Sequence, residues 1–93
     1  MSPLQLRIHL GAVLRRERSQ RGFSQEGFAD ALGMHRTYYG AIERGEKNLA
    51  LSTLLRVGAG LSLPLSTLFS CAEARATAVG PAKPQSADAA ELP

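Results

Sequence analysis

Residues 18–48 read RSQRGFSQEGFADALGMHRTYYGAIERGEKN, and two short helix patterns lie in this stretch on either side of a glycine. The first pattern spans about residues 25–32 and follows Ser24, a residue type that commonly caps a helix N-terminus. The second spans about residues 36–44. Gly33, between them, can take the left-handed backbone conformation of a tight turn. We therefore predict two short helices joined by a tight turn.

The second of these helices opens with polar and basic side chains. His35 stands at its N-cap, and Arg36, Thr37 and Tyr38 follow, all suited to base edges or phosphates. A helix-turn-helix needs this arrangement to place one helix in the DNA major groove. The stretch therefore favours a DNA-binding regulator over an enzyme.

Three further helices are predicted from the spacing of apolar residues. A loose arm over about residues 1–6 precedes a first helix over about residues 8–21, which Gly22 ends. Gly58 and Gly60 lie inside the fourth helix and predict close backbone packing, since each costs about 1 kcal/mol relative to alanine. The apolar residues expected to face inward are Phe28, Ala29 and Leu32 in the second helix and Tyr39 and Ile42 in the third. The fourth helix carries Leu51, Leu54, Gly58 and Leu61 on one face, and the fifth, which follows Pro64, carries Leu65, Leu68 and Phe69.

This pattern predicts an all-α protein with one small DNA-binding domain over residues 8–70. The alanine-rich residues 71–79 can extend the fifth helix. From residue 80 onward Pro, Ala, Ser and Gln dominate, so residues 80–93 are predicted to be a disordered tail. Ninety-three residues leave too thin a core for an elaborate active site as well.

The charge of the chain is unevenly distributed. Residues 1–70 hold nine Lys and Arg against five Asp and Glu, whereas residues 71–93 hold two against three. The folded part is therefore the basic part, as a phosphate-binding surface requires. Nine of the eleven cations are arginine, which favours bidentate contacts to phosphate or guanine.

Several other classes of function find no support in the sequence. A lone Cys71 excludes an internal disulfide, suits a reducing cytoplasm and is expected to be an inert hydrophobe rather than a redox switch or an intermolecular bridge. Two histidines and one cysteine, widely separated, make no metal site. No catalytic triad pattern or phosphate-binding loop is present, and no apolar run approaches membrane-spanning length. We expect no cofactor, no small-molecule ligand and no membrane partner.

The chain from Leu10 to Phe69 resembles the lambda-repressor-like helix-turn-helix domains of the Xre/Cro family. The run RTYYGAIERGEKNL is in addition similar to the controller proteins of restriction–modification systems. The resemblance implies five helices, with the second crossing the DNA backbone and the third in the groove. The matching positions are Leu10-Gly11, Leu14-Arg15, Arg18, Gly22-Phe23-Ser24-Gln25, Phe28-Ala29, Leu32-Gly33, Ile42-Glu43-Arg44-Gly45, and Leu54 to Leu61.

The resemblance also implies roles for individual residues. It places Arg36, Thr37 and Ala41 against base edges, and Arg18 with Glu43 in a partly buried ion pair between the first and third helices. The phosphate contacts that it implies are Gln25, Tyr38, Lys47 and Asn48.

The chemistry of the base-contact residues agrees with these roles. The Arg36 guanidinium can donate two hydrogen bonds to guanine O6 and N7, Thr37 offers a hydroxyl and a methyl group, and Ala41 can meet a thymine methyl. Gln25 at a helix N-terminus adds its amide to free backbone N–H groups, which suits a phosphate.

Two positions depart from the family pattern in ways that reduce stability. Gly27 removes the capping box of the second helix, and Ala50 stands where a Ser or Thr commonly caps the fourth.

The sequence supports two hypotheses of function. The first is a cytoplasmic, sequence-specific transcriptional regulator that binds a two-fold operator as a homodimer, since one recognition helix covers only a few base pairs. Its dimer interface is expected on the fifth helix, at Leu65, Leu68 and Phe69 with Ala72, because so small a domain should leave part of this surface exposed. The alternative is a protein-interaction module, such as an antitoxin with secondary DNA binding, whose residues 80–93 contact a partner.

Overall fold

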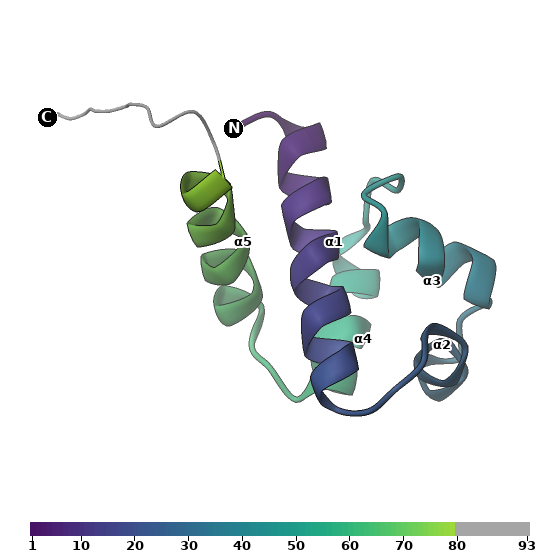
Figure 1. Ribbon diagram of the computed structural model, residues 1–93. Helices are drawn as coiled ribbons and strands as arrows, with labels where there is room; N and C mark the ends of the chain where they lie inside the picture. Colours follow the sequence, from purple (N-terminus) through teal and green to yellow (C-terminus); the bar gives the residue numbers. More distant parts are fainter. Residues whose placement is uncertain (80–93) are drawn as a thin grey trace, which may run out of the picture.

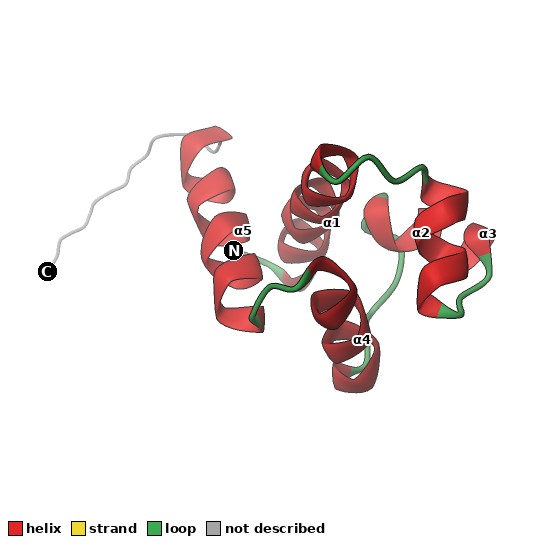
Figure 2. Cartoon of the chain, turned by 90° about the horizontal axis from the view of Figure 1, so that it is seen from below, coloured by secondary structure: helices red, strands yellow, loops and turns green. Residues whose placement is uncertain are grey.

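The computed structural model describes residues 1–79 of the chain, which form five helices and no strand (Figures 1 and 2). The all-α prediction is therefore confirmed. The predicted disordered tail, residues 80–93, lies outside the described residues. The helices are α1 (Pro3–Gln20), α2 (Gln25–Leu32), α3 (Arg36–Glu43), α4 (Leu51–Leu61) and α5 (Leu65–Val79).

Helix α1 begins five residues earlier than the sequence pattern indicated. The Ser2 Oγ accepts a hydrogen bond from the Gln5 backbone N–H at 3.1 Å, and the Gln5 Oε1 accepts one from the Ser2 backbone N–H at 2.8 Å. This reciprocal pair is a capping box, and Pro3 supplies a backbone already suited to the first turn. The prediction of a loose arm over residues 1–6 was wrong because it overlooked this cap.

The predicted ends of α2 and the start of α3 are confirmed. The Ser24 Oγ accepts a hydrogen bond from the Gly27 backbone N–H at 2.9 Å, and Gly33 ends α2 in the left-handed conformation with a φ of 69°. At the start of α3, the His35 Nδ1 accepts a hydrogen bond from the Thr37 backbone N–H at 3.2 Å. These local caps fix a short turn between two eight-residue helices.

The core forms where α1 packs against α3 and α5, where α2 packs against α3 and α4, and where α4 packs against α5. Tyr39 and Ile42 point inward from α3 as predicted, and the Tyr39 ring meets the Phe28 ring edge-on with centroids 5.3 Å apart. Helix α1 lies between α5 on one side and α3 on the other (Figure 1). The buried apolar residues are Leu10, Val13, Leu14, Phe28, Ala29, Met34, Tyr39, Ala41, Ile42, Leu54, Val57, Leu61, Leu68 and Ala72.

The inner face of α5 is buried more completely than expected. Leu68 and Ala72 are almost inaccessible to solvent, and Leu65 and Phe69 are half-buried against the core. Leu68 and Ala72, which were expected to contribute to a dimer surface, are covered within the subunit, because α5 packs lengthwise against α1 (Figure 1). The additional turns of α1 lengthen the surface that α5 can cover.

Helix α4 directs inward most of the face that was expected to hold Leu51, Leu54, Gly58 and Leu61. Its buried residues are Leu54, Val57, Gly58 and Leu61, whereas Leu51 is 74% exposed. Leu51 was expected on the same face as Leu54 and Leu61 but is exposed, because it lies in the first turn of α4, beyond the surface that the neighbouring helices cover. Leu55, one turn later, is 61% exposed.

Both glycines of α4 lie where other parts of the chain come close, as predicted. A Cβ atom on Gly60 would lie 2.5 Å from Leu32 Cδ2 and 3.2 Å from Phe28 Cζ. A Cβ on Gly58 would lie 3.0 Å from the Leu63 carbonyl oxygen. Close packing against α2 and α5 therefore offsets the helix propensity that the two glycines lose.

Gly11 sets the distance between α1 and α3. A Cβ atom there would collide with the Glu43 carbonyl group and lie 2.8 Å from the Ile42 carbonyl oxygen, and neither backbone atom can rotate away. We expect Gly11→Ala to lower the free energy of unfolding by about 1–3 kcal/mol, measured by urea denaturation. Gly40→Ala is the matched control, because only the side-chain atoms of Arg44 and Gln25 lie close to it. Equal stability of both variants would contradict the close approach.

Candidate nucleic-acid interface

Helices α2 and α3 lie together on the side of α1 that faces away from α5 (Figures 1 and 2). A shallow hollow opens between the beginning of α2 and the exposed face of α3. Its lining combines both helices and is mostly polar. The lining residues are Gln25, Glu26, Arg36, Thr37, Gly40 and Arg44.

A second hollow lies on the other side of α3, toward the loop that follows it. It shares Thr37 and Arg44 with the first hollow, so the two form one continuous surface, here called the α3 face. Arg36 and Thr37 at the N-terminal end of α3 are exposed on it. The residues lining the second hollow are His35, Thr37, Tyr38, Ala41, Arg44, Glu46 and Lys47.

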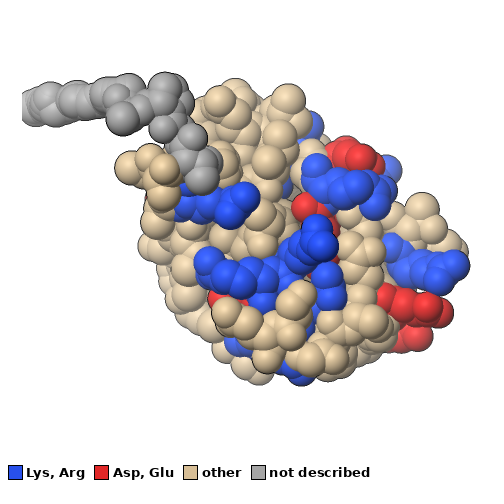
Figure 3. All heavy atoms as spheres, in the orientation of Figure 1, with Lys and Arg blue, Asp and Glu red and all other residues tan. Residues whose placement is uncertain are grey.

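Carboxylates lie beside two of the cations on the α3 face. The Arg36 Nη1 lies 3.1 Å from the Glu26 Oε1, and both side chains are about two-thirds exposed, at 66% and 64%. The Arg44 guanidinium donates to both Glu46 carboxylate oxygens, at 3.0 and 3.2 Å, and this contact lowers the pKa of Glu46. Figure 3 likewise shows acidic groups beside basic ones toward the α2 and α3 side of the molecule.

The loop after α3 is held in place from the side of α1. Gly45 has a φ of 76°, and a Cβ atom there would lie 2.8 Å from the Ile8 Cα. The Arg7 Nε donates a hydrogen bond to the Gly45 carbonyl oxygen at 3.2 Å. Lys47, two residues further on, has its Nζ 5.8 Å from the centroid of the half-buried Tyr38 ring, within the range of a cation–π contact.

A buried ion pair supports the α3 face from behind. The Arg18 Nε donates to the Glu43 Oε2 at 2.6 Å and its Nη2 donates to the Glu43 Oε1 at 3.1 Å, so the contact is bidentate. Only 8% of the Arg18 side chain and 2% of the Glu43 side chain are exposed. A further donor, the Arg18 Nη1, bonds the Phe23 carbonyl oxygen at 2.6 Å. The pair thus ties α1, α3 and the loop before α2 together.

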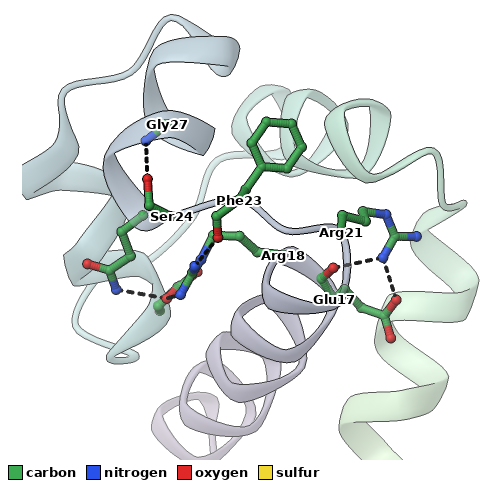
Figure 4. Close-up of polar contacts among 8 residues, drawn as sticks. Glu17, Arg18, Arg21, Phe23, Ser24 and Gly27 are labelled. Atoms are coloured by element: carbon green, nitrogen blue, oxygen red, sulfur yellow. Dashed lines mark hydrogen bonds and ion pairs between the residues drawn. The ribbon is translucent and has the colours of Figure 1, made fainter.

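Figure 4 shows the surroundings of this pair. Arg18 reaches from α1 toward the Phe23 carbonyl, beside the Ser24 cap of α2, while Arg21 and Glu17 pair separately at the end of α1. Burial by itself would raise the pKa of Glu43. The hydrogen bonds that its carboxylate accepts, led by those of Arg18, outweigh burial and hold the pKa below its usual value. Glu43 is therefore an ionised, fully engaged group rather than one free to meet DNA.

Two residues expected at the interface are partly withdrawn from it. The Gln25 Nε2 donates a hydrogen bond to the Glu43 Oε1 at 2.8 Å, which directs this amide group inward. Ala41 lines the second hollow but is only 6% exposed, because it lies close to the buried side of α3. Asn48 is exposed in the loop, outside the lining of both hollows.

Three charged residues of the α3 face were missing from the expected site, namely Glu26, Arg44 and Glu46. Their positions carried a usable signal. Glu26 follows Gln25 directly at the start of α2, and Arg44 and Glu46 follow α3 within three residues. Charged residues this close in sequence to the predicted helix-turn-helix can be expected on the same surface.

Comparison with known proteins agrees with this geometry. A helix-turn-helix domain family matches residues 9–67, and the chain belongs to this family of DNA-binding regulators. Control protein C.MunI of a Mycoplasma species is 41% identical over 66 residues, which are 70% of this chain and 89% of that protein. Control protein C.SmaI of Serratia marcescens is 39% identical over 60 residues, which are 64% and 71% of the two chains.

Solved structures show the same relationship. The restriction–modification controller protein C.AhdI from Aeromonas hydrophila superimposes with a TM-score of 0.68 and 31% identity, covering 73% of this chain and 99% of that one. The hypothetical transcription factor NHTF from Neisseria superimposes with a TM-score of 0.71 and 32% identity, covering 85% and 89%. The resemblance to Xre/Cro regulators and their controller branch is confirmed. The protein is a helix-turn-helix transcriptional regulator and not an enzyme.

Within residues 1–79, no single helix has the length and apolar character needed to cross a membrane. Helices α4 and α5 would meet both criteria only when taken together, and they are bent by 94° relative to each other.

Proposed function

We propose that the protein binds a two-fold DNA site as a homodimer, with α3 of each subunit in the major groove, and thereby controls transcription as a cytoplasmic regulator. The observation that carries this proposal is the α3 face, on which Arg36 and Thr37 are exposed at the start of α3 beside Lys47. Relatives that are named as control proteins support a role of the same kind, in the control of restriction–modification genes.

Sequence readout falls to the exposed residues of α3 in this proposal. Arg36 donates only one N–H to Glu26, so its guanidinium keeps donors for guanine O6 and N7. Thr37, which lines both hollows, meets a neighbouring base with its hydroxyl or methyl group. The small exposed area of Ala41 limits it to contact with a thymine methyl.

Phosphate contacts fall to the residues around α3. Lys47 and Asn48 come from the loop that Gly45 anchors against α1, and Tyr38 lies beneath the Lys47 ammonium group. Gln25 acts chiefly through the free backbone N–H groups at the start of α2, because its amide already donates to Glu43. These contacts fix the register on the duplex while α3 reads the bases.

Pairing of two subunits supplies a second recognition helix, so that the protein can read a second half-site on the DNA. Two half-sites about one helical turn apart, roughly 34–36 Å, require a two-fold dimer. Leu68 is buried and unavailable for the interface expected on α5. Leu51 and Leu55 are exposed one turn apart on α4, and Leu65 and Phe69 in the first turns of α5 are half-buried. We assign the dimer surface to these four apolar residues.

The dimer surface can be tested without disturbing the core. We expect Leu55→Glu to convert the dimer to a monomer, because two carboxylates would be buried against apolar surface. The subunit should still fold, because Leu55 is 61% exposed within it. Sedimentation equilibrium at micromolar concentration measures the oligomeric state. Leu4→Glu is the matched control, since Leu4 is similarly exposed on α1 but lies outside the proposed surface. A monomeric wild-type protein at tens of micromolar would contradict the dimer.

The proposed DNA site is tested by selecting bound sequences from a pool of random duplexes. The proposal predicts a two-fold symmetric consensus. Recovery of unrelated sequences would contradict it. The alternative of a protein-interaction module depended on residues 80–93, which lie outside the described part of the chain.

A further inference from the structure

The ion pair between Arg36 and Glu26 lies in the first hollow of the α3 face. Arg36 is the first residue of α3 and Glu26 the second residue of α2, and their side chains meet across the first hollow at 3.1 Å. Both are about two-thirds exposed, so solvent or DNA reaches the pair freely. A carboxylate thus lies within hydrogen-bond distance of the arginine proposed to read a base.

Fold stability gives little reason for this carboxylate. Exposed ion pairs contribute little because water screens them and ordering two long side chains costs entropy. Glu26 also lies at the start of α2, where an acidic group has a modest favourable interaction with the helix dipole, but the same charge anywhere in that turn would suffice. At a DNA-binding surface a negative charge is costly, since it repels the phosphate backbone.

The position of Glu26 beside Arg36 suggests that this repulsion of phosphate has a function. An unpaired Arg36 would attach to any phosphate within reach, and this would hold the protein on DNA of every sequence. With Glu26 beside it, the pair is neutral and attracts a charged phosphate only weakly. The hydrogen-bond acceptors of guanine are uncharged, so the same carboxylate opposes a guanine contact far less.

We propose that Glu26 is a specificity-determining residue that directs Arg36 toward guanine and away from phosphate. It acts through Arg36, by accepting a hydrogen bond from one guanidinium N–H and offsetting the positive charge, and so it is a positioning residue rather than a base contact. This inference rests on the proposed function, in which α3 reads a two-fold DNA site.

The test compares wild type and Glu26→Gln on a selected two-fold duplex and on a scrambled duplex of the same composition. Glutamine keeps the size of the side chain and a hydrogen-bond acceptor but removes the charge. We expect scrambled-duplex affinity to rise by about 3- to 10-fold and selected-duplex affinity by less than about 2-fold, so that discrimination falls. The salt dependence on scrambled DNA should also steepen by about 1 in log–log slope per subunit, because Arg36 now contacts a phosphate.

Two controls separate this role from a simple change of charge. Glu73→Gln removes the same charge from an exposed position of α5, and it should leave the ratio of the two affinities unchanged. In an Arg36→Ala background, Glu26→Gln should also leave the ratio unchanged, since the carboxylate no longer has an arginine to direct. Melting temperatures of all variants show whether the fold is retained.

The possible outcomes are distinct. If Glu26→Gln strengthens both duplexes equally, or changes the ratio equally without Arg36, Glu26 is only a repulsive charge and the inference is wrong. If the wild-type protein itself does not prefer the selected duplex, the proposed function fails instead.

Discussion

Replacing Glu43 with alanine is expected to lower the free energy of unfolding by about 3–5 kcal/mol. The reason is that Arg18 would remain buried with no carboxylate to accept its bidentate hydrogen bonds at 2.6 and 3.1 Å. The Gln25 amide would lose its acceptor as well. Urea denaturation measures the change, and DNA affinity should fall only as far as the loss of folded protein requires.

The matched control is Glu46→Ala, which removes a carboxylate from an exposed ion pair with Arg44. Its melting temperature should stay close to that of wild type, because solvent screens both groups. An unchanged melting temperature in Glu43→Ala, combined with lost DNA binding, would make Glu43 a functional residue and contradict the structural role.

The second large effect is expected from Arg36→Ala on the selected DNA site. If Arg36 reads a guanine in each half-site, its loss should cost about 1–3 kcal/mol per half-site and relax the preference at one base pair of each. Scrambled DNA should be affected much less, since Glu26 neutralises this arginine in the free protein. Titration of both duplexes with wild type and variant measures the difference.

Lys47→Ala provides the contrast that makes this result informative. A lysine that holds a phosphate contributes on every sequence, so its loss should weaken both duplexes alike and lower the log–log salt slope by about 1 per subunit. Equal weakening of both duplexes by Arg36→Ala would mean that Arg36 also holds a phosphate, and the position of α3 in the groove would have to be revised.

Local signals in the sequence predicted the helix-turn-helix well. Ser24, Gly33 and His35 each act on the backbone within three residues, through a hydrogen bond or a left-handed conformation. Such effects do not depend on the rest of the fold, so the bounds of α2 and the start of α3 follow from the sequence. The capping box at Ser2 is equally local, and the prediction there failed only because the Gln5 partner was overlooked.

Burial was harder to predict because it depends on how distant helices meet. Leu51 and Leu54 are both apolar and three residues apart in α4, yet only Leu54 reaches the core. Leu68 was expected to be available for dimerisation, but α5 packs lengthwise against α1 and buries it. In both cases the spacing of apolar residues identifies a helix face, but the angle between helices decides which part of that face is covered.

In the candidate site, too, local features were predicted from the sequence, whereas contacts between helices were not. Arg36 and Lys47 were expected on the α3 face from the sequence, whereas the Glu26 partner of Arg36 depends on the angle at which the turn sets α2 against α3. The inward contact of Gln25 with Glu43 depends on that angle too. Residue types therefore indicated what the surface binds, and only the structure revealed the acidic partners that modulate it.

The most direct test of the account is a titration of the wild-type protein against three duplexes of equal length at one salt concentration. The first carries both selected half-sites, the second has one half-site scrambled, and the third has both scrambled. A two-fold dimer that reads bases through α3 should lose affinity in two steps, with a total loss of about 10³-fold or more. Equal affinity for all three duplexes would contradict sequence-specific binding.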